Sequence, residues 1–344
     1  MRYYYPDYFK DFVCIGGKAC SDSCCHIWQI TVDKKTLRKY KHVTGELGKR
    51  MAEKIDQKTG DICPHGEENR CEFLNEDNLC DIVAKLGEDY LCETCYTHPR
   101  HEEVYPDVRE RSLAITCPIA CRQLLERKEP VRIIYEDTDE PGDKDKKFDY
   151  ELFDVLLKTR DNLLKLQQDR ELTISQRMAL SLGTSHDIER RIRARSVRNK
   201  NTGFLDKLFA KKNSFTDEEL GDIEKILKYY KKSDAFEKMC KNIEKSEESD
   251  WFMLDDEEDK KKILSDMIFT LCTMEALKPT WIPYLQSVLN IRQQMDNKEY
   301  LETYKEFEAV TDDIEIEQLL FYFTYVYCCQ SAYDGALLAK IKMA

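Results

Sequence analysis

The sequence predicts a mainly α protein, in which a cysteine-rich, loop-rich N-terminal metal-binding domain with few short strands precedes an all-helical C-terminal domain. Most of the 15 cysteines fall between Cys14 and Cys121. Glycine is scarce, with 12 residues, which disfavours glycine-rich nucleotide-binding folds. Apolar residues recur at helical spacing after about residue 148. We therefore expect a cysteine-rich domain at 1–135, an acidic linker at 136–148 and a helical domain at 149–344.

Composition excludes several classes of protein. The chain of 344 residues is 42% hydrophobic and 35% charged, which suits two domains or one large domain. Its net charge of -12 argues against nucleic acid and against anionic membranes as partners. The N-terminus has no signal-peptide pattern, and no apolar run is long enough to span a bilayer. The expected location is the cytoplasm.

The N-terminal domain is predicted to consist of loops and short elements. Residues 1–13 are rich in aromatic residues and expected to be irregular. Gly16 and Gly17 allow a tight loop after Cys14. Residues 28–32 are typical of a short strand, and Asp33 suits the N-cap of a helix that follows it.

Further along, residues 75–78 have the composition of a turn. Pro118 is placed for the first turn of a helix that begins after Cys117 and continues through Leu125. The cysteines would thus lie on loops and at the ends of short helices.

The C-terminal domain shows helical signals throughout. Residues 152–157 carry an apolar stripe, and capping boxes open helices at Thr173 and Thr216. Gly183 is placed to end the first of these two helices. Further helices are predicted around 260–277 and 313–330, and the aromatic residues at 321–327 are interpreted as core rather than as a cofactor site.

The clustered thiols indicate a metal site. Cytosolic cysteines stay reduced, which favours metal binding over disulfides, although any single cysteine can simply be packed. Thiolates suit zinc, copper(I) or iron–sulfur clusters. Only Cys92 and Cys95 show the two-residue spacing of structural zinc sites, whereas ligands spread over several loops suit a four-cysteine iron–sulfur cluster. Adjacent Cys24 and Cys25 point in different directions, so one binds a given metal while the other packs or serves a second centre.

Other candidate groups give weaker signals. Four histidines lie within the cysteine-rich stretch and are more often solvated than ligating: His26, His65, His98 and His101. Cys95 and His98 lack the third group expected of a nucleophile and its base. The arginines between 190 and 198 are interpreted as a solvated helix face, with attraction of an acidic protein as the alternative.

The first half of the chain contains the motifs Cys14-x5-Cys20-x3-Cys24-Cys25-x2-Trp28, Cys71-Glu72-Phe73-Leu74, Leu79-Cys80-Asp81-Ile82, Leu86-Gly87-Glu88, Thr94-Cys95 with Pro99-Arg100, and Glu110-Arg111-Ser112-Leu113 with Cys117-Pro118. These motifs resemble those of the flagellin lysine-N-methylase family. The resemblance runs from end to end, with the specific motifs in the first half and mainly helical character in the second.

This resemblance implies transfer of methyl groups from S-adenosylmethionine to lysines of flagellin in the bacterial cytoplasm, with a [4Fe-4S] cluster bound by motif cysteines. The cysteines that match the motifs, and so the candidate metal ligands, are Cys14, Cys20, Cys24, Cys25, Cys71, Cys80, Cys95 and Cys117. Eight thiols exceed the four that one cluster needs. The first expectation is a subset of Cys20, Cys24, Cys80, Cys95 and Cys117.

The chain departs from the family pattern at Ile27, His98 and Ile119. Three cysteines look additional to that pattern and are left out of the ligand set: Cys63, Cys92 and Cys121. Arg100 and Arg111 would either offset the negative charge of a cluster or form surface ion pairs. Neither a catalytic base nor the binding site of the methyl donor is identified. The alternative is a non-catalytic structural or interaction protein that binds zinc or an iron–sulfur cluster.

Overall fold

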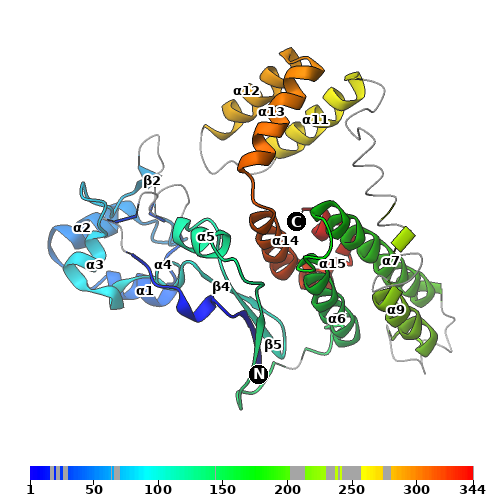
Figure 1. Cartoon of the computed structure of the whole chain (residues 1–344). Coiled ribbons are helices and arrows are strands. Elements are labelled where there is room, and N and C mark those ends of the chain that lie inside the picture. The colour runs from blue at the N-terminus through cyan, green and yellow to red at the C-terminus, as the bar shows by residue number, and fades with distance from the viewer. Residues whose placement is uncertain are drawn as a thin grey trace.

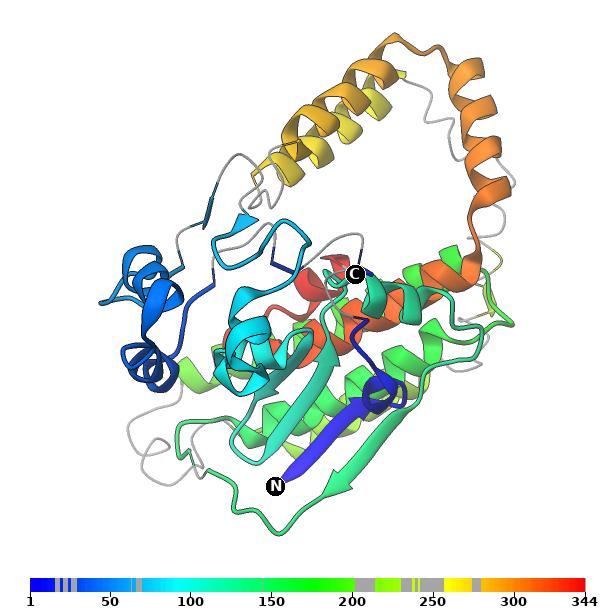
Figure 2. The ribbon, with the colours of Figure 1, turned by 90° about the vertical axis from the view of Figure 1, so that its left-hand side faces the viewer.

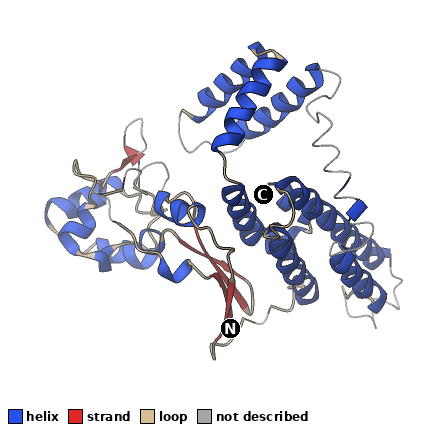
Figure 3. Cartoon of the chain, in the orientation of Figure 1, coloured by secondary structure: helices blue, strands red, loops and turns tan. Residues whose placement is uncertain are grey.

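The structure is a computed structural model, and it confirms a mainly α protein with few short strands (Figure 3). It describes residues 1–15, 19–20, 24–25, 30–62, 64–65, 70–143, 145–201, 214–229, 237–238, 241, 257–273 and 280–343. Several predictions lie outside these residues, namely those on Gly16, Gly17, His26, the start of the 28–32 strand and Cys63. Within 30–32, only Thr31 forms a bridge, to Asp61.

A four-stranded sheet forms part of the first half of the chain. Its order is β4 (Arg100–Val104), β5 (Val108–Leu113), β1 (Arg2–Pro6) and β6 (Ile133–Asp137). β1 pairs in parallel with β5 and antiparallel with β6. The prediction that residues 1–13 are irregular was therefore wrong for residues 2–6, because Pro6 lies at the very end of a strand that pairs with β5 and β6.

Short elements surround the cysteines. The helices are α1 (Lys34–Tyr40), α2 (Gly45–Lys54), α3 (Asp81–Leu86), α4 (Glu93–Thr97) and α5 (Pro118–Leu125), with 3₁₀ turns at Phe9–Asp11 and Glu88–Tyr90 and the strand pair β2 (Pro64–His65) and β3 (Arg70–Cys71). As predicted, Asp33 caps α1 and Pro118 opens α5. Gly48 of α2 is required by close packing, because a Cβ there would lie 2.0 Å from the Val43 carbonyl oxygen.

The second half is helical (Figure 1). Its helices are α6 (Tyr150–Gln167), α7 (Ile174–Asn201), α9 (Asp217–Tyr229), α11 (Glu257–Cys272), α12 (Trp281–Gln294), α13 (Asn297–Val310), α14 (Asp313–Tyr327), α15 (Ser331–Asp334) and α16 (Leu337–Met343), with a 3₁₀ turn at Cys328–Gln330. The capping boxes at Thr173 and Thr216 are confirmed. Gly183 does not end its helix, since α7 continues to Asn201 and a single glycine costs only about 1 kcal/mol there.

The sheet packs against α6 and α14 through what we call the shared core. Tyr325 of α14 donates from its hydroxyl to the Tyr4 carbonyl oxygen at 2.9 Å, which ties the two halves of the chain together. As predicted, the aromatic residues of α14 are largely core. The shared core comprises Tyr5, Tyr8, Phe9, Phe12, Leu113, Ala120, Leu124, Val131, Leu164, Phe321, Tyr322 and Tyr325.

A second, separate core supports the short helices of the first half. We call it the 30–95 core; it comprises Ile30, Val32, Leu37, Tyr40, Leu47, Met51, Ile55, Ile62, Phe73, Ile82 and Cys92. By contrast, α11, α12 and α13 stand away from the rest of the helices in both views (Figure 1 and Figure 2). Among the described helices, none is long and apolar enough to cross a membrane.

Candidate functional site

The predicted ligand cysteines divide between the two cores. Cys71, Cys80 and Cys95 pack against the 30–95 core, in which Cys92 is buried. Cys117 packs against the shared core, at the N-cap of α5. Four of the eight candidate cysteines therefore lie against two different cores, which the sequence alone did not indicate.

The thiols around the 30–95 core share a local geometry. The Cys71 sulfur accepts a hydrogen bond from the backbone N–H of Phe73, and the Cys80 sulfur accepts from Ile82 and Val83. A sulfur folded back over the N–H groups two and three residues later suits a thiolate, because these donors stabilise its negative charge. Burial raises the pKa of Cys71 to about 12 and raises that of Cys80 as well, so neither thiol ionises readily by itself.

Cys92 and Cys95 form a pair on α4. Cys92 is the N-cap residue, and the Cys95 thiol donates to its sulfur, as do the backbone N–H groups of Thr94 and Cys95. The hydrogen bond from Cys95 is the largest influence and lowers the pKa of Cys92 to about 7, whereas donating that bond and being buried raise the pKa of Cys95. Cys92 was left out of the candidate ligands in the sequence analysis, and its contact with Cys95 was therefore missed. The two-residue spacing between these cysteines was the signal that could have revealed the contact.

Asp33 fixes the start of α4 as well as that of α1. Its carboxylate accepts from the backbone N–H groups of Lys35 at 3.0 Å, Thr36 at 2.9 Å and Glu93 at 3.0 Å. Burial opposes ionisation, but these hydrogen bonds prevail and lower the pKa of Asp33 to about 2. One side chain thus sets the position of the helix that carries Cys92 and Cys95.

We expect Asp33→Ala to lower the free energy of unfolding by about 1 kcal/mol at neutral pH, the usual loss for an N-cap. Because the folded pKa lies below that of the unfolded chain, the contribution is complete above about pH 4 and is lost as the pH falls toward 2. Urea unfolding of both proteins between pH 7 and pH 2.5 measures this. Asp33→Asn, a neutral cap, is the control, and a loss in Asp33→Ala that stays constant with pH would contradict the assignment.

Cys24 and Cys25 lie between the two groups of thiols. The Cys24 thiol donates to Cys25, and this bond is the largest cause of its raised pKa, followed by burial and by the charges of Cys25, Cys14 and Cys117. Cys25 in turn acts electrostatically on Cys71, Cys80 and Cys95. Its carbonyl oxygen also accepts from the Cys71 backbone N–H at 2.7 Å. Cys24 therefore lies within electrostatic reach of Cys14 and Cys117, and Cys25 within reach of thiols that pack against the 30–95 core.

Thiols are suitable donors for a metal bound by thiolates, but the described side chains do not form a set of ligands around one point. In the described part of the chain, no three His, Cys, Asp or Glu side chains are gathered closely enough to hold an ion. The metal-binding character predicted for the N-terminal domain is therefore not shown by the geometry. Cys20 is half-buried in the same segment as Cys14 and Cys24.

The two arginines considered for charge compensation differ in position. Arg100 donates to the Phe12 carbonyl oxygen at 3.1 Å, and its guanidinium lies 5.2 Å from the centre of the Phe12 ring. Phe12 lies two residues before Cys14 in the sequence. Arg111 instead pairs with Glu102 at 2.7 Å on the face of the sheet. Of the histidines, His98 is half-buried and burial lowers its pKa, whereas His101 is exposed beside Glu103. Arg100 is thus held against Phe12, whereas Arg111 forms an ion pair on the sheet.

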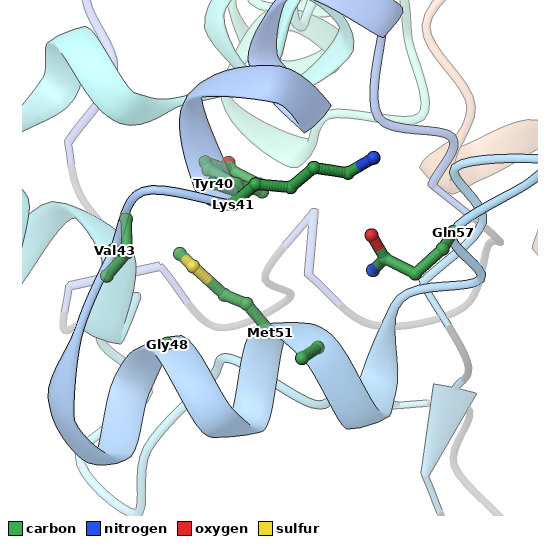
Figure 4. A pocket seen from close by; sticks show the side chains of 7 residues that line it. Tyr40, Lys41, Val43, Gly48, Met51 and Gln57 are labelled. Atoms are coloured by element: carbon green, nitrogen blue, oxygen red, sulfur yellow. The ribbon is translucent and has the colours of Figure 1, made fainter.

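Neither of two pockets formed by the described residues is lined by a candidate cysteine. The first, of about 180 Å³, lies between α1 and α2 and is lined by Tyr40, Lys41, Val43, Gly48, Met51, Ala52 and Gln57 (Figure 4). It is smaller than the cavities of about 300–1,000 Å³ that hold cofactor-sized ligands. The second, of about 450 Å³, is lined by Asp107, Gly142, Asp143, Asp145, Lys146 and Tyr150. Neither pocket identifies a place for a methyl donor near the thiols.

Comparison with known proteins relates the chain to one family. Residues 160–344 match the family model described as the FliB lysine N-methylase C-terminal domain, more than half of the chain. A flagellar biosynthetic protein, FliU, from Salmonella muenchen is 32% identical over 127 residues, which are 35% of this chain and 75% of that protein.

Lysine-N-methylases from Salmonella choleraesuis and Salmonella typhimurium are also 32% identical over 127 residues, again 35% of this chain but 31% of each relative. The match thus spans less than a third of the length of these two enzymes. No solved structure matches the chain.

Proposed function

The chain belongs to the FliB lysine N-methylase family, and on that premise we propose that it is a protein-lysine N-methyltransferase acting on flagellin, with S-adenosylmethionine as the methyl donor. The single observation that carries the proposal is the family match over residues 160–344. The similarity to a flagellar biosynthetic protein and to two lysine-N-methylases supports both the substrate and the reaction. The proposed setting is the bacterial cytoplasm, before flagellin is exported.

The reaction transfers a methyl group between two heteroatoms. The lone pair of the lysine Nζ attacks the methyl carbon, the carbon–sulfur bond of the sulfonium breaks, and the sulfur leaves with that electron pair as a neutral thioether. The product ammonium then loses a proton. Because only the neutral amine has a lone pair, the site must lower the pKa of the lysine by desolvation or accept its proton.

We also propose that a [4Fe-4S] cluster is bound next to the shared core, on the side where Cys117 packs against it. Cys14, Cys24 and Cys117 would be ligands there, since Cys14 and Cys117 both act electrostatically on Cys24, and Cys20 belongs to the same segment. A bound cluster supplies a redox-active, Lewis-acidic centre. Arg100, held on the Phe12 carbonyl oxygen, would offset its negative charge.

The test is a methylation assay on protein purified without oxygen. The full chain is incubated with flagellin and S-adenosylmethionine that carries a labelled methyl group, and label on lysine is read by mass spectrometry. We expect labelled lysines, and no label on flagellin whose lysines were acetylated beforehand. Iron and sulfide are measured on the same preparation, with about four of each expected per chain. Binding of flagellin without transfer of label would reject the enzyme and favour a non-catalytic metal-binding protein.

A further inference from the structure

Helices α11, α12 and α13, which we call the outlying helices, carry a concentration of exposed apolar side chains. None of their described residues belongs to the shared core or to the 30–95 core, and in Figure 2 they stand clear of both. Exposed apolar side chains gathered in one part of a protein are typical of an interaction surface, whereas single ones need no explanation. Those of the outlying helices are Met267, Phe269, Trp281, Ile282, Tyr284, Ile291, Phe307 and Val310.

The apolar face of α12 is wider than the part of it that is buried. Leu285 is buried in the middle of this face, where α12 packs against α11. Tyr284 and Ile291, spaced seven residues apart along one flank of the face, are 59% and 54% exposed. Trp281 stacks on Tyr284, with 6.1 Å between the ring centres. Apolar surface on α12 therefore continues past its contact with α11.

α12 also presents no charged side chain to the solvent. Arg292 is the single charged residue in its sequence, and it is buried. A helix at the surface of a monomeric protein usually carries charged residues on its outer face. The Arg292 guanidinium instead lies 4.2 Å from the centre of the Tyr300 ring of α13, which fixes the corner between the two helices. The exposed face of α12 is thus held in place by contacts inside the unit.

α13 adds negative charge beside further apolar side chains. Its sequence contains the glutamates Glu299, Glu302, Glu306 and Glu308 and the lysines Lys298 and Lys305. Glu302 and Glu306 are exposed and lie one turn apart, and Phe307 and Val310 continue the helix from there. Lys298 approaches Glu302 at 4.0 Å, an exposed contact of the kind that contributes little. The surface therefore combines apolar area with an excess of carboxylates.

We propose that the outlying helices dock the protein substrate through a segment that carries both apolar side chains and lysines. The inference rests on the proposed function, which makes this substrate flagellin. A lysine methyltransferase must hold a chain whose target side chains are cationic, and an acidic surface on a chain of net charge -12 is complementary to them. The apolar side chains of α12 and α13 supply the contact area, and Glu302 and Glu306 favour segments with lysines.

The first test measures binding of flagellin to the full chain in the absence of any methyl donor. The double variant Tyr284→Ser with Ile291→Ser is expected to raise the Kd for flagellin by roughly 10-fold or more, because large side chains at the centre of an interface carry most of its affinity. Val197→Ser is the matched control, since Val197 is 58% exposed on α7, outside the outlying helices. Its Kd should equal that of the parent, and the thermal midpoints should agree in all three proteins.

A second test reverses charge. Glu302→Lys with Glu306→Lys is expected to weaken binding and to remove most of its dependence on salt, because complementary surface charges are screened by added ions. Glu218→Lys with Glu224→Lys, at exposed positions of α9, changes the net charge equally and is the control. In the methylation assay the variants of the outlying helices should raise the KM for flagellin and leave kcat unchanged, as expected for contacts remote from the reacting atoms.

Four results would overturn the docking proposal. They are no binding of flagellin by the parent, an unchanged Kd in the Tyr284→Ser, Ile291→Ser variant, an equal loss in the control on α9, and a parent dimer that this variant converts to a monomer. The last result would assign the surface to a second copy of the chain. Binding that the variant loses, together with no methyl transfer by the parent, would instead reject the proposed reaction and retain the docking surface.

Discussion

Replacing Arg160 with methionine is expected to lower the free energy of unfolding by about 3–5 kcal/mol, the usual effect of removing one partner of a buried ion pair. Arg160 is fully buried on α6 and pairs with Glu110 of β5, which is 4% exposed. Its guanidinium also lies over the rings of Tyr4 and Tyr325, at 5.3 and 5.2 Å from their centres. Methionine would leave the Glu110 carboxylate buried without its cation.

Arg111→Met is the matched control, because Arg111 pairs with Glu102 at a half-exposed position of the same sheet. Exposed pairs contribute about 0–1 kcal/mol, so this variant should remain close to the parent in urea unfolding. A double variant, Arg160→Met with Glu110→Leu, should recover part of the loss. Glu110 Oε2 and Arg160 Nε are buried without hydrogen bonds in the described structure, which makes the pair costly to bury. An equal loss in Arg160→Met and Arg111→Met would contradict this account.

Cys117→Ser is expected to remove the proposed iron–sulfur cluster and to lower methyl transfer by more than about 100-fold, since replacing even an indirect partner of a metal ligand costs 10–100-fold. Serine is a good N-cap, so α5 should keep its start at Pro118 and the variant should fold. The measurements are iron and sulfide content, the visible absorption of the cluster and transfer of labelled methyl groups to flagellin.

Cys121→Ser provides the control for this prediction. Cys121 lies one turn further along α5 and is half-buried like Cys117. We expect the Cys121→Ser variant to keep both its iron and its methyl-transfer activity. Full iron content in Cys117→Ser would remove this residue from the ligand set, and loss of iron in both variants would point to damage to α5 rather than to a lost ligand.

Local sequence signals located many of the helix boundaries correctly. Asp33, Thr173 and Thr216 each mark a helix start that the structure contains, because a capping side chain bonds to N–H groups only two or three residues away. The helical period of the second half, and the core position of the aromatic residues on α14, followed from spacing along the chain in the same way.

The strand β1 could not be predicted by the same means. Residues 2–6 pair with β5, about a hundred residues away, and with β6, further still. Strand formation depends on such distant partners, and a short aromatic segment that ends in proline carries little local signal. Gly183 shows the opposite case, in which a local stop signal is overridden by the packing of α7 against α6 and α16.

For the candidate site, the sequence by itself determined the inventory: a set of thiols in the first half of the chain, the two-residue spacing of Cys92 and Cys95, and the resemblance that names a methylase family. Only the tertiary structure decided how the thiols are grouped. Cys71, Cys80, Cys92 and Cys95 adjoin one core and Cys117 another, with Cys24 and Cys25 between them. The physical reason is that ligand groups are set by which apolar surfaces pack together, and packing joins residues that spacing along the chain cannot relate.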